Sequence, residues 1–142
     1  MQADTPPLPA RLLLRMSCDV SAVPGIAQSI RGFLLTQGCS EKEVNDCELA
    51  LVEACNNAVL YVAPGSHRCE VVVEAISGLE EIELRVTDHT AGLVWPERTT
   101  LPDSSSERGR GLFMIQAVMD STRYVRGPTG NTLVLQKRRS RL

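Results

Sequence analysis

One segment near the middle of the chain restricts the possible folds most, because it is almost entirely apolar and yet carries polar side chains. Residues 49–60 read LALVEACNNAVL, a composition typical of a helix that is buried on most of its sides. Glu53, Asn56 and Asn57 lie in the middle of this helix. A buried polar group without a hydrogen bond costs about 1–3 kcal/mol, so these side chains need partners.

Glu53 and Asn57 are one helical turn apart and share a helix face. A carboxylate beside a carboxamide oxygen suits a hard divalent cation and a water or hydroxyl that is to be deprotonated. Alternatively, the two groups bond to neighbouring backbone or pair with arginines. The helix alone leaves both interpretations open.

The surrounding segments predict a single α+β domain. We expect strands at residues 11–17, 70–76, 81–87, 121–125 and 132–136, and helices at residues 21–36, 40–61 and 109–119. Ser21 is the expected N-cap of the first helix, and Ser40 with Glu43 forms a capping box for the second. Because strands arrive in pairs with helices between them, we expect a mixed, mostly antiparallel sheet with helices packed on one face.

The composition limits partners and location. The net charge of -2 gives no basic field that would attract nucleic acid, and no apolar run approaches the ~20 residues that span a membrane. We find no signal peptide and no CxxC pair among the five cysteines, so we expect reduced thiols in a cytoplasmic protein. The predicted domain covers residues 11–137, between a flexible tail of residues 1–10 and a basic, solvated tail of residues 138–142.

A second candidate site follows the strand that ends in RVTD. Asp88 is its last residue, and Gly92 and Leu93 follow shortly after. An aspartate at such a place is often only part of an Asx-turn. Its carboxylate could instead accept a hydrogen bond from the exocyclic amine of adenine.

A third candidate site is Gly109-Arg110-Gly111-Leu112, where the last predicted helix begins. Glycines let the backbone approach a ligand, and a helix N-terminus offers unpaired N–H groups to phosphate. Arg108 and Arg110 could add charge-assisted contacts. The segment is not a Walker A loop, since no Gly-Lys-Ser/Thr follows. Alone, it could be a plain helix-initiating turn.

In this order, the three motifs resemble those of the ATPase domain shared by sensor histidine kinases, gyrase and a heat-shock chaperone. The closest likeness is to the small anti-sigma-factor serine kinases, and it extends over residues 12–137. Residues 53–58 resemble the helix motif of that family, and residues 88–92 resemble its adenine box. Residues 109–112 resemble the second glycine box, and residues 130–132 resemble the last box, whose threonine is Thr132 here.

The resemblance implies a two-layer, Bergerat-type ATP-binding sandwich with ATP and Mg²⁺ as cofactors. Asn57 would ligate Mg²⁺, and Glu53 would be the general base that activates a serine hydroxyl. The ATP-binding residues implied in this way are Asn57, Asp88, Gly92, Leu93, Arg108, Gly109, Arg110, Gly111, Leu112 and Thr132.

The resemblance also implies protein partners. The chain would phosphorylate an anti-sigma-factor antagonist of the STAS type and would hold a sigma factor once that antagonist is released. It would thereby regulate transcription by partner switching, and a homodimer is compatible with this role. Two positions depart from the family pattern: Thr90 replaces a glycine of the adenine box, and Ala27 replaces a partner-contacting arginine, for which Arg31 is a candidate substitute.

Two other functions compete with this interpretation. A non-catalytic partner-switching module would bind nucleotide and sequester a regulatory protein, although it would have little need of Glu53. The catalytic half of a histidine kinase is disfavoured, because neither His67 nor His89 lies in a predicted dimerisation helix.

Overall fold

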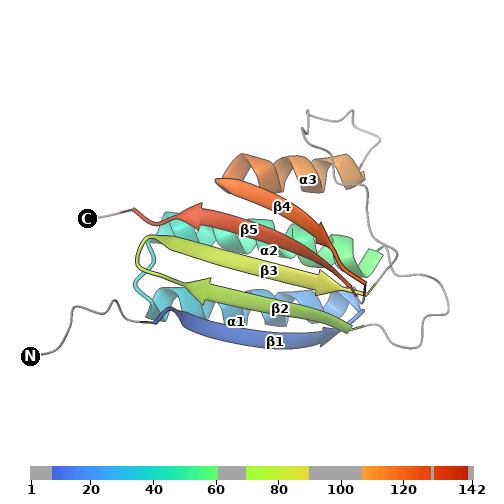
Figure 1. Cartoon of the computed structure of the whole chain (residues 1–142), viewed down its shortest axis with the longest axis horizontal. Helices are drawn as coiled ribbons and strands as arrows, with labels where there is room; N and C mark the ends of the chain where they lie inside the picture. The colour runs from blue at the N-terminus through green and yellow to red at the C-terminus, as the bar shows by residue number, and fades with distance from the viewer. Residues whose placement is uncertain (1–7, 61–69, 90–106, 129, 141–142) are drawn as a thin grey trace, which may run out of the picture.

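Five strands form one continuous sheet in the computed structural model (Figure 1), which describes residues 8–60, 70–89, 107–128 and 130–140. The strands are β1 (Ala10–Ser17), β2 (Glu70–Ser77), β3 (Glu81–Asp88), β4 (Ser121–Arg126) and β5 (Asn131–Arg138). Their order is β1-β2-β3-β5-β4, and every neighbouring pair is antiparallel. The predicted α+β sheet is therefore confirmed, and the described strands contain no parallel pair.

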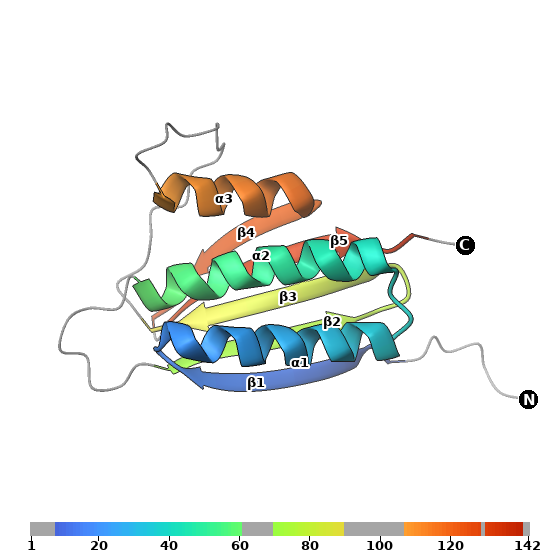
Figure 2. The same cartoon turned by 180° about the vertical axis from the view of Figure 1, so that it is seen from behind.

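Three helices cover one face of this sheet, as Figures 1 and 2 show from opposite sides. They are α1 (Val23–Thr36), α2 (Glu41–Leu60) and α3 (Glu107–Val118). The core lies between the two layers, where Ile30, Leu51, Leu84, Ile115 and Leu135 are completely buried. The alternation of buried and half-buried residues along β2 and β3 explains why one sheet face takes all the helices.

The start of α1 differs from the prediction. The N-cap of α1 is Ala22 rather than Ser21, and it makes no side-chain cap bond. Just before it, the Asp19 carboxylate accepts a hydrogen bond from the Ser21 backbone N–H at 2.9 Å. This bond caps a short 3-10 helix, Val20–Ala22, that precedes α1. Pro24 stands in the first turn of α1, as expected, since its missing N–H costs nothing there.

The predicted capping box of α2 is confirmed. The Ser40 hydroxyl accepts from the Glu43 backbone N–H at 3.1 Å, and the Glu43 carboxylate accepts from the Ser40 backbone N–H at 2.7 Å. Two otherwise unpaired backbone groups are thereby satisfied where α2 begins. α2 is thus fixed at its start, and the polar residues of interest lie in its second half.

The C-terminal segment is anchored rather than solvated, so the predicted tail of residues 138–142 is wrong over its described part. Strand β5 runs through Arg138, and the Arg139 guanidinium donates to the Gln37 and Gly78 carbonyl oxygens, each at 2.8 Å. The Ser140 backbone N–H donates to the Glu43 carboxylate. These contacts join β5 to the ends of α1 and β2 and to the start of α2.

The cysteines only partly match the expected reduced state. Cys39, Cys47 and Cys55 are buried free thiols, and burial raises the pKa of Cys55 to about 12, which suits a core role. Cys18 is disulfide-bonded, so the expectation was wrong for this residue. Within the described ranges, no helix has the length and apolar character needed to cross a bilayer.

Candidate nucleotide-binding site

Two of the three sequence motifs meet where α2 packs against α3. A Cβ atom placed on Gly111 of α3 would lie 2.9 Å from Glu53 Oε2, 3.5 Å from Asn57 Nδ2 and 3.6 Å from Asn57 Oδ1. Real Cβ atoms essentially never approach another heavy atom to 2.9 Å. The bare backbone at Gly111 therefore gives the carboxylate and the carboxamide of α2 the room they occupy.

The polar atoms at this junction are incompletely paired. Asn57 is only 8% exposed, and its Nδ2 is a buried side-chain atom with no hydrogen-bond partner among the described residues. Glu53, one turn earlier on the same helix, is half-buried. An unpaired buried amide donor costs about 1–3 kcal/mol. The Asn57 amide thus keeps an unused donor among the described residues, while the side chains of Arg108 and Arg110, which could serve as partners in the alternative interpretation, lie outside them.

The same residues fit a magnesium nucleotide. Mg²⁺ is usually held by one or two protein ligands together with phosphate oxygens and waters. The described residues contain no group of three or more His, Cys, Asp or Glu side chains able to hold a metal. A carboxamide such as that of Asn57, whose oxygen and nitrogen exchange places by a half-turn, can supply one oxygen ligand.

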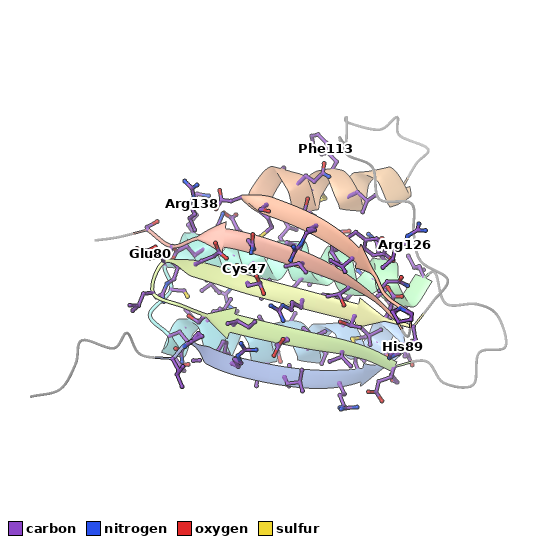
Figure 3. The ribbon with its side chains drawn as sticks, in the orientation of Figure 1. Cys47, Glu80, His89, Phe113, Arg126 and Arg138 are labelled. Atoms are coloured by element: carbon purple, nitrogen blue, oxygen red, sulfur yellow. The ribbon has the colours of Figure 1, made fainter. Side chains whose placement is uncertain are left out.

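The Asp88 motif lies at the same end of the molecule as the second half of α2 and the start of α3 (Figures 1 and 2). Asp88 is the last residue of β3 and is 7% exposed, and its Oδ1 accepts a hydrogen bond from Asn131 Nδ2 at 3.3 Å. Asn131 is the first residue of β5 and faces Asp88 in the strand register. His89 follows directly at the end of the strand (Figure 3).

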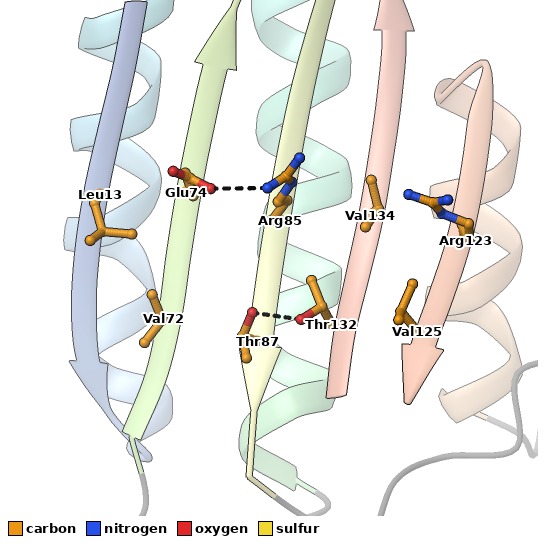
Figure 4. A pocket seen from close by; sticks show the side chains of 9 residues that line it. All are labelled: Leu13, Val72, Glu74, Arg85, Thr87, Arg123, Val125, Thr132 and Val134. Atoms are coloured by element: carbon orange, nitrogen blue, oxygen red, sulfur yellow. Dashed lines mark hydrogen bonds and ion pairs between the residues drawn. The ribbon is translucent and has the colours of Figure 1, made fainter. Parts of the chain in front are cut away.

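Thr132 does not join this group. Its hydroxyl is 2.9 Å from the hydroxyl of Thr87, on the sheet face opposite the helices (Figure 4). There it lines a shallow groove of about 400 Å³ whose other members include Glu74, Arg85 and Arg123. Successive residues of a strand point to opposite faces, so the Thr132 side chain lies on the other side of the sheet from the Asp88 carboxylate. The predicted adenine contact of Thr132 is therefore not supported.

Several predicted site residues can be placed only in part. Gly92 and Leu93 lie outside the described residues, as do the lid and Thr90. Arg108, Gly109 and Arg110 belong to the first turns of α3, where only the backbone is described. Leu112 is buried beside Gly111. The roles of these residues stay predictions.

The two partner-contact candidates of α1 have different environments. Ala27 is 4% exposed and belongs to the buried side of α1, so its side chain offers no surface to a partner. The Arg31 guanidinium donates to Glu48 at 2.7 Å and to Asn45 at 2.8 Å, on the surface between α1 and α2. Arg31 is therefore held within this chain.

Asn131 is not among the site residues predicted from the sequence. Its neighbour Thr132 matched the family pattern, and the strand was expected to begin one residue later. The alternation that would have shown which residue points inward is hidden, because Leu133, Val134 and Leu135 are all apolar.

Comparison with known proteins identifies the family of the chain. Residues 16–137 match the family described as the histidine kinase-like ATPase domain. The serine-protein kinase RsbW of Bacillus licheniformis is 28% identical over 123 residues, which cover 79% of this chain and 75% of that protein.

Two solved structures share the fold. One contains the RsbU and RsbW domains of Rv1364c from Mycobacterium tuberculosis, with a TM-score of 0.70, 23% identity and coverage of 94% of this chain and 33% of that one. This chain thus spans about a third of the mycobacterial chain. The other is the SiaB–SiaC complex from Pseudomonas aeruginosa, with a TM-score of 0.60, 15% identity and coverage of 89% of both chains. Because the family match covers most of its length, the chain belongs to the histidine kinase-like ATPase domain family and is a distant homologue of the serine-protein kinase RsbW.

Proposed function

We propose that this chain is an ATP-dependent protein serine kinase and anti-sigma factor whose substrate is a STAS-type anti-sigma-factor antagonist. The observation that carries the proposal is the meeting of Glu53, Asn57 and Gly111, where a buried amide has no partner among the described residues and a missing side chain leaves room. The relative named as a serine-protein kinase supports the choice of serine as acceptor.

The roles follow from the chemistry of each group. The Asn57 carboxamide oxygen would ligate Mg²⁺, which would supply charge neutralisation for the phosphates of ATP. Glu53 would accept the proton of the substrate serine. As the bond from the serine oxygen to the γ-phosphorus forms, the bond from the γ-phosphorus to the β–γ bridging oxygen breaks, and ADP leaves. Asp88 would hold the adenine, and the start of α3 would direct backbone N–H groups to the phosphates.

Gly111 belongs to this mechanism as a positioning residue. Its missing side chain lets α3 lie against Glu53 and Asn57 without pushing the carboxylate away. In phosphoryl transfer, most of the catalysis is positioning and charge neutralisation. A displaced carboxylate would therefore reduce the rate even if ATP were still bound.

Partner switching extends the proposal to the regulation of transcription. The unphosphorylated antagonist would compete with a sigma factor for the chain, and phosphorylation would release the antagonist. The SiaB–SiaC complex has the same fold in one of its chains and is itself a protein–protein complex, which supports a protein partner.

The test combines the purified chain, Mg²⁺, labelled ATP and an unphosphorylated STAS-type antagonist. We expect acid-stable label on the antagonist, as phosphoserine gives, and a loss of at least about a hundredfold in transfer rate for Glu53→Gln with ATP binding retained. Asn57→Ala should abolish Mg²⁺-dependent ATP binding measured by calorimetry. Asn56→Ala is the matched control, because it removes the neighbouring half-buried amide of the same helix.

Each alternative has its own outcome in this experiment. ATP binding without any transfer would overturn the kinase and favour the non-catalytic module. Acid-labile label would indicate phosphohistidine instead of phosphoserine. Unchanged ATP affinity in Asn57→Ala would remove the role assigned to that side chain.

A further inference from the structure

Two buried polar residues face each other where β3 ends and β5 begins. Asp88 is 7% exposed and Asn131 is 4% exposed. They are directly opposed in the antiparallel register, and the Asn131 amide donates to Asp88 Oδ1 at 3.3 Å. Both lie on the helix-covered face, since Val86 and Leu133, two residues away on each strand, are in the core.

The backbone around this pair is tightly packed. A Cβ atom on Gly130 would lie 2.7 Å from the Asp88 carbonyl oxygen and 3.0 Å from His89 Nδ1. The residue before Asn131 is thus pressed against the backbone of Asp88 itself. The two strands cannot separate here without losing this contact, so Asn131 has a fixed position from which to orient the Asp88 carboxylate.

We infer that Asn131, and not Thr132, is the residue that fixes the Asp88 carboxylate and thereby makes the site select a 6-amino purine over a 6-oxo purine. The inference rests on the proposed function, because it assigns the purine-reading part of the same nucleotide site. A carboxylate accepts hydrogen bonds and cannot donate them. Its preference between two purines therefore depends on where its oxygens point.

The chemistry of the two bases shows why orientation matters. Adenine offers an exocyclic 6-amino donor, whereas hypoxanthine offers a 6-oxo acceptor and a ring N1–H donor. A carboxylate held against the position of the amine meets a donor in the first base and an acceptor in the second. A carboxylate free to turn could accept from the ring N1–H as well, and the discrimination would fall.

Thr132 provides a matched comparison. It is the next residue of the same strand, but its hydroxyl lies beside the Thr87 hydroxyl on the opposite face of the sheet. A change at Thr132 perturbs the same part of β5 without touching the Asp88 carboxylate. Effects that follow only from a damaged strand end should therefore appear whether Asn131 or Thr132 is changed.

The experiment measures the dissociation constants of Mg-ATP and Mg-ITP, which differ at the 6-position, for the full chain and three variants. We expect Asn131→Ala to weaken ATP roughly tenfold while changing ITP little, so that the ATP/ITP preference falls roughly tenfold. Asn131→Ser, which keeps a hydroxyl donor, should restore part of the preference. Thr132→Val should leave it unchanged. Urea unfolding of each variant separates loss of selectivity from loss of folding.

The outcomes distinguish this inference from the proposed function. An unchanged ATP/ITP preference in Asn131→Ala, or an equal fall in Thr132→Val, would overturn the inference alone. If Asn131→Ala does not fold, the ATP/ITP preference of Asn131→Ser decides. A preference weaker than that of wild type, but still in favour of ATP, supports the inference, and a preference equal to that of wild type opposes it. A wild-type chain that binds neither nucleotide would overturn both, whereas a selectivity change without transfer to serine would overturn only the kinase.

Discussion

The Asn57 amide acts against the stability of the chain that carries it. Its Nδ2 is buried without a partner in the described part of the structure, and such a group lowers stability by about 1–3 kcal/mol. A ligand that supplies the missing interaction binds only the folded state, so it should also raise the free energy of unfolding. Under the proposed function, folding and nucleotide binding would thus be coupled at a single side chain.

Gly111 leads to a prediction at the same scale. In Gly111→Ala, the new Cβ would lie 2.9 Å from Glu53 Oε2, so the carboxylate must move by several tenths of an ångström. We expect the rate of transfer to serine to fall by about tenfold or more, with kcat affected more than KM. The free energy of unfolding should change by less than about 1 kcal/mol, because alanine favours the helix and Glu53 can turn aside.

The control for this variant is Gly32→Ala in α1, where a new Cβ meets nothing within 4 Å. It should raise the free energy of unfolding by about 0.5–1 kcal/mol and leave transfer unchanged. Initial-rate kinetics and urea unfolding measure both properties. Equal transfer rates in Gly111→Ala and wild type would contradict the positioning role of Gly111.

At the scale of elements, α2 depends on the charge of Glu43. Burial acts to raise the pKa of Glu43, but backbone hydrogen bonds from Ser40 and Ser140 outweigh it, so its pKa lies below the ordinary value of 4.5. A carboxylate with a lowered pKa stabilises the fold above its unfolded pKa and loses that contribution as pH falls through its folded pKa.

Glu43→Gln should therefore cost about 1–2 kcal/mol of unfolding free energy at pH 7. The difference from wild type should shrink as pH falls below about 4.5, the ordinary pKa that Glu43 regains in the unfolded wild-type chain, because Glu43 is then protonated and its charge is lost. Urea unfolding at a series of pH values between 7 and 3 measures this. A difference that stays constant or grows in acid would show that the charge of Glu43 is not the source.

The elements also show what the sequence can and cannot predict. α2 was predictable because Ser40 and Glu43 mark its start and its apolar residues require burial. The face to which Thr132 points was not, because an unbroken apolar run conceals the strand alternation. The contact of Gly111 with α2 depends on how two helices pack, which local patterns do not specify. The motif order nevertheless indicated that these elements share one site.

At the scale of the whole molecule, the C-terminal segment holds distant parts together. The Arg139 guanidinium reaches the Gln37 carbonyl oxygen, 102 residues earlier in the chain, and also bonds to Ser77 and Gly78. A short basic segment at the end of a chain is normally expected to be solvated, so the sequence did not predict this anchoring. Only the folded structure brings the acceptors for Arg139 together.

A chain ending at Arg138 should therefore be less stable than one ending at Ser140, by about 2–4 kcal/mol, since it loses the bonds of Arg139 and the Ser140 N–H. Chemical denaturation of the two truncated proteins measures the difference. The longer protein is the matched control, because it lacks only residues 141–142. Equal midpoints would show that the anchoring contributes nothing to stability.

The groove on the sheet face opposite the helices is connected to the helix-covered face through β3 and β5. Thr87 and Thr132 line the groove, and their immediate neighbours Asp88 and Asn131 point to the helix-covered face. A single layer of backbone separates the two pairs. A change in the spacing of β3 and β5 on one face of the sheet must therefore alter their spacing on the other face. The two strands thus link the groove mechanically to the Asp88–Asn131 pair.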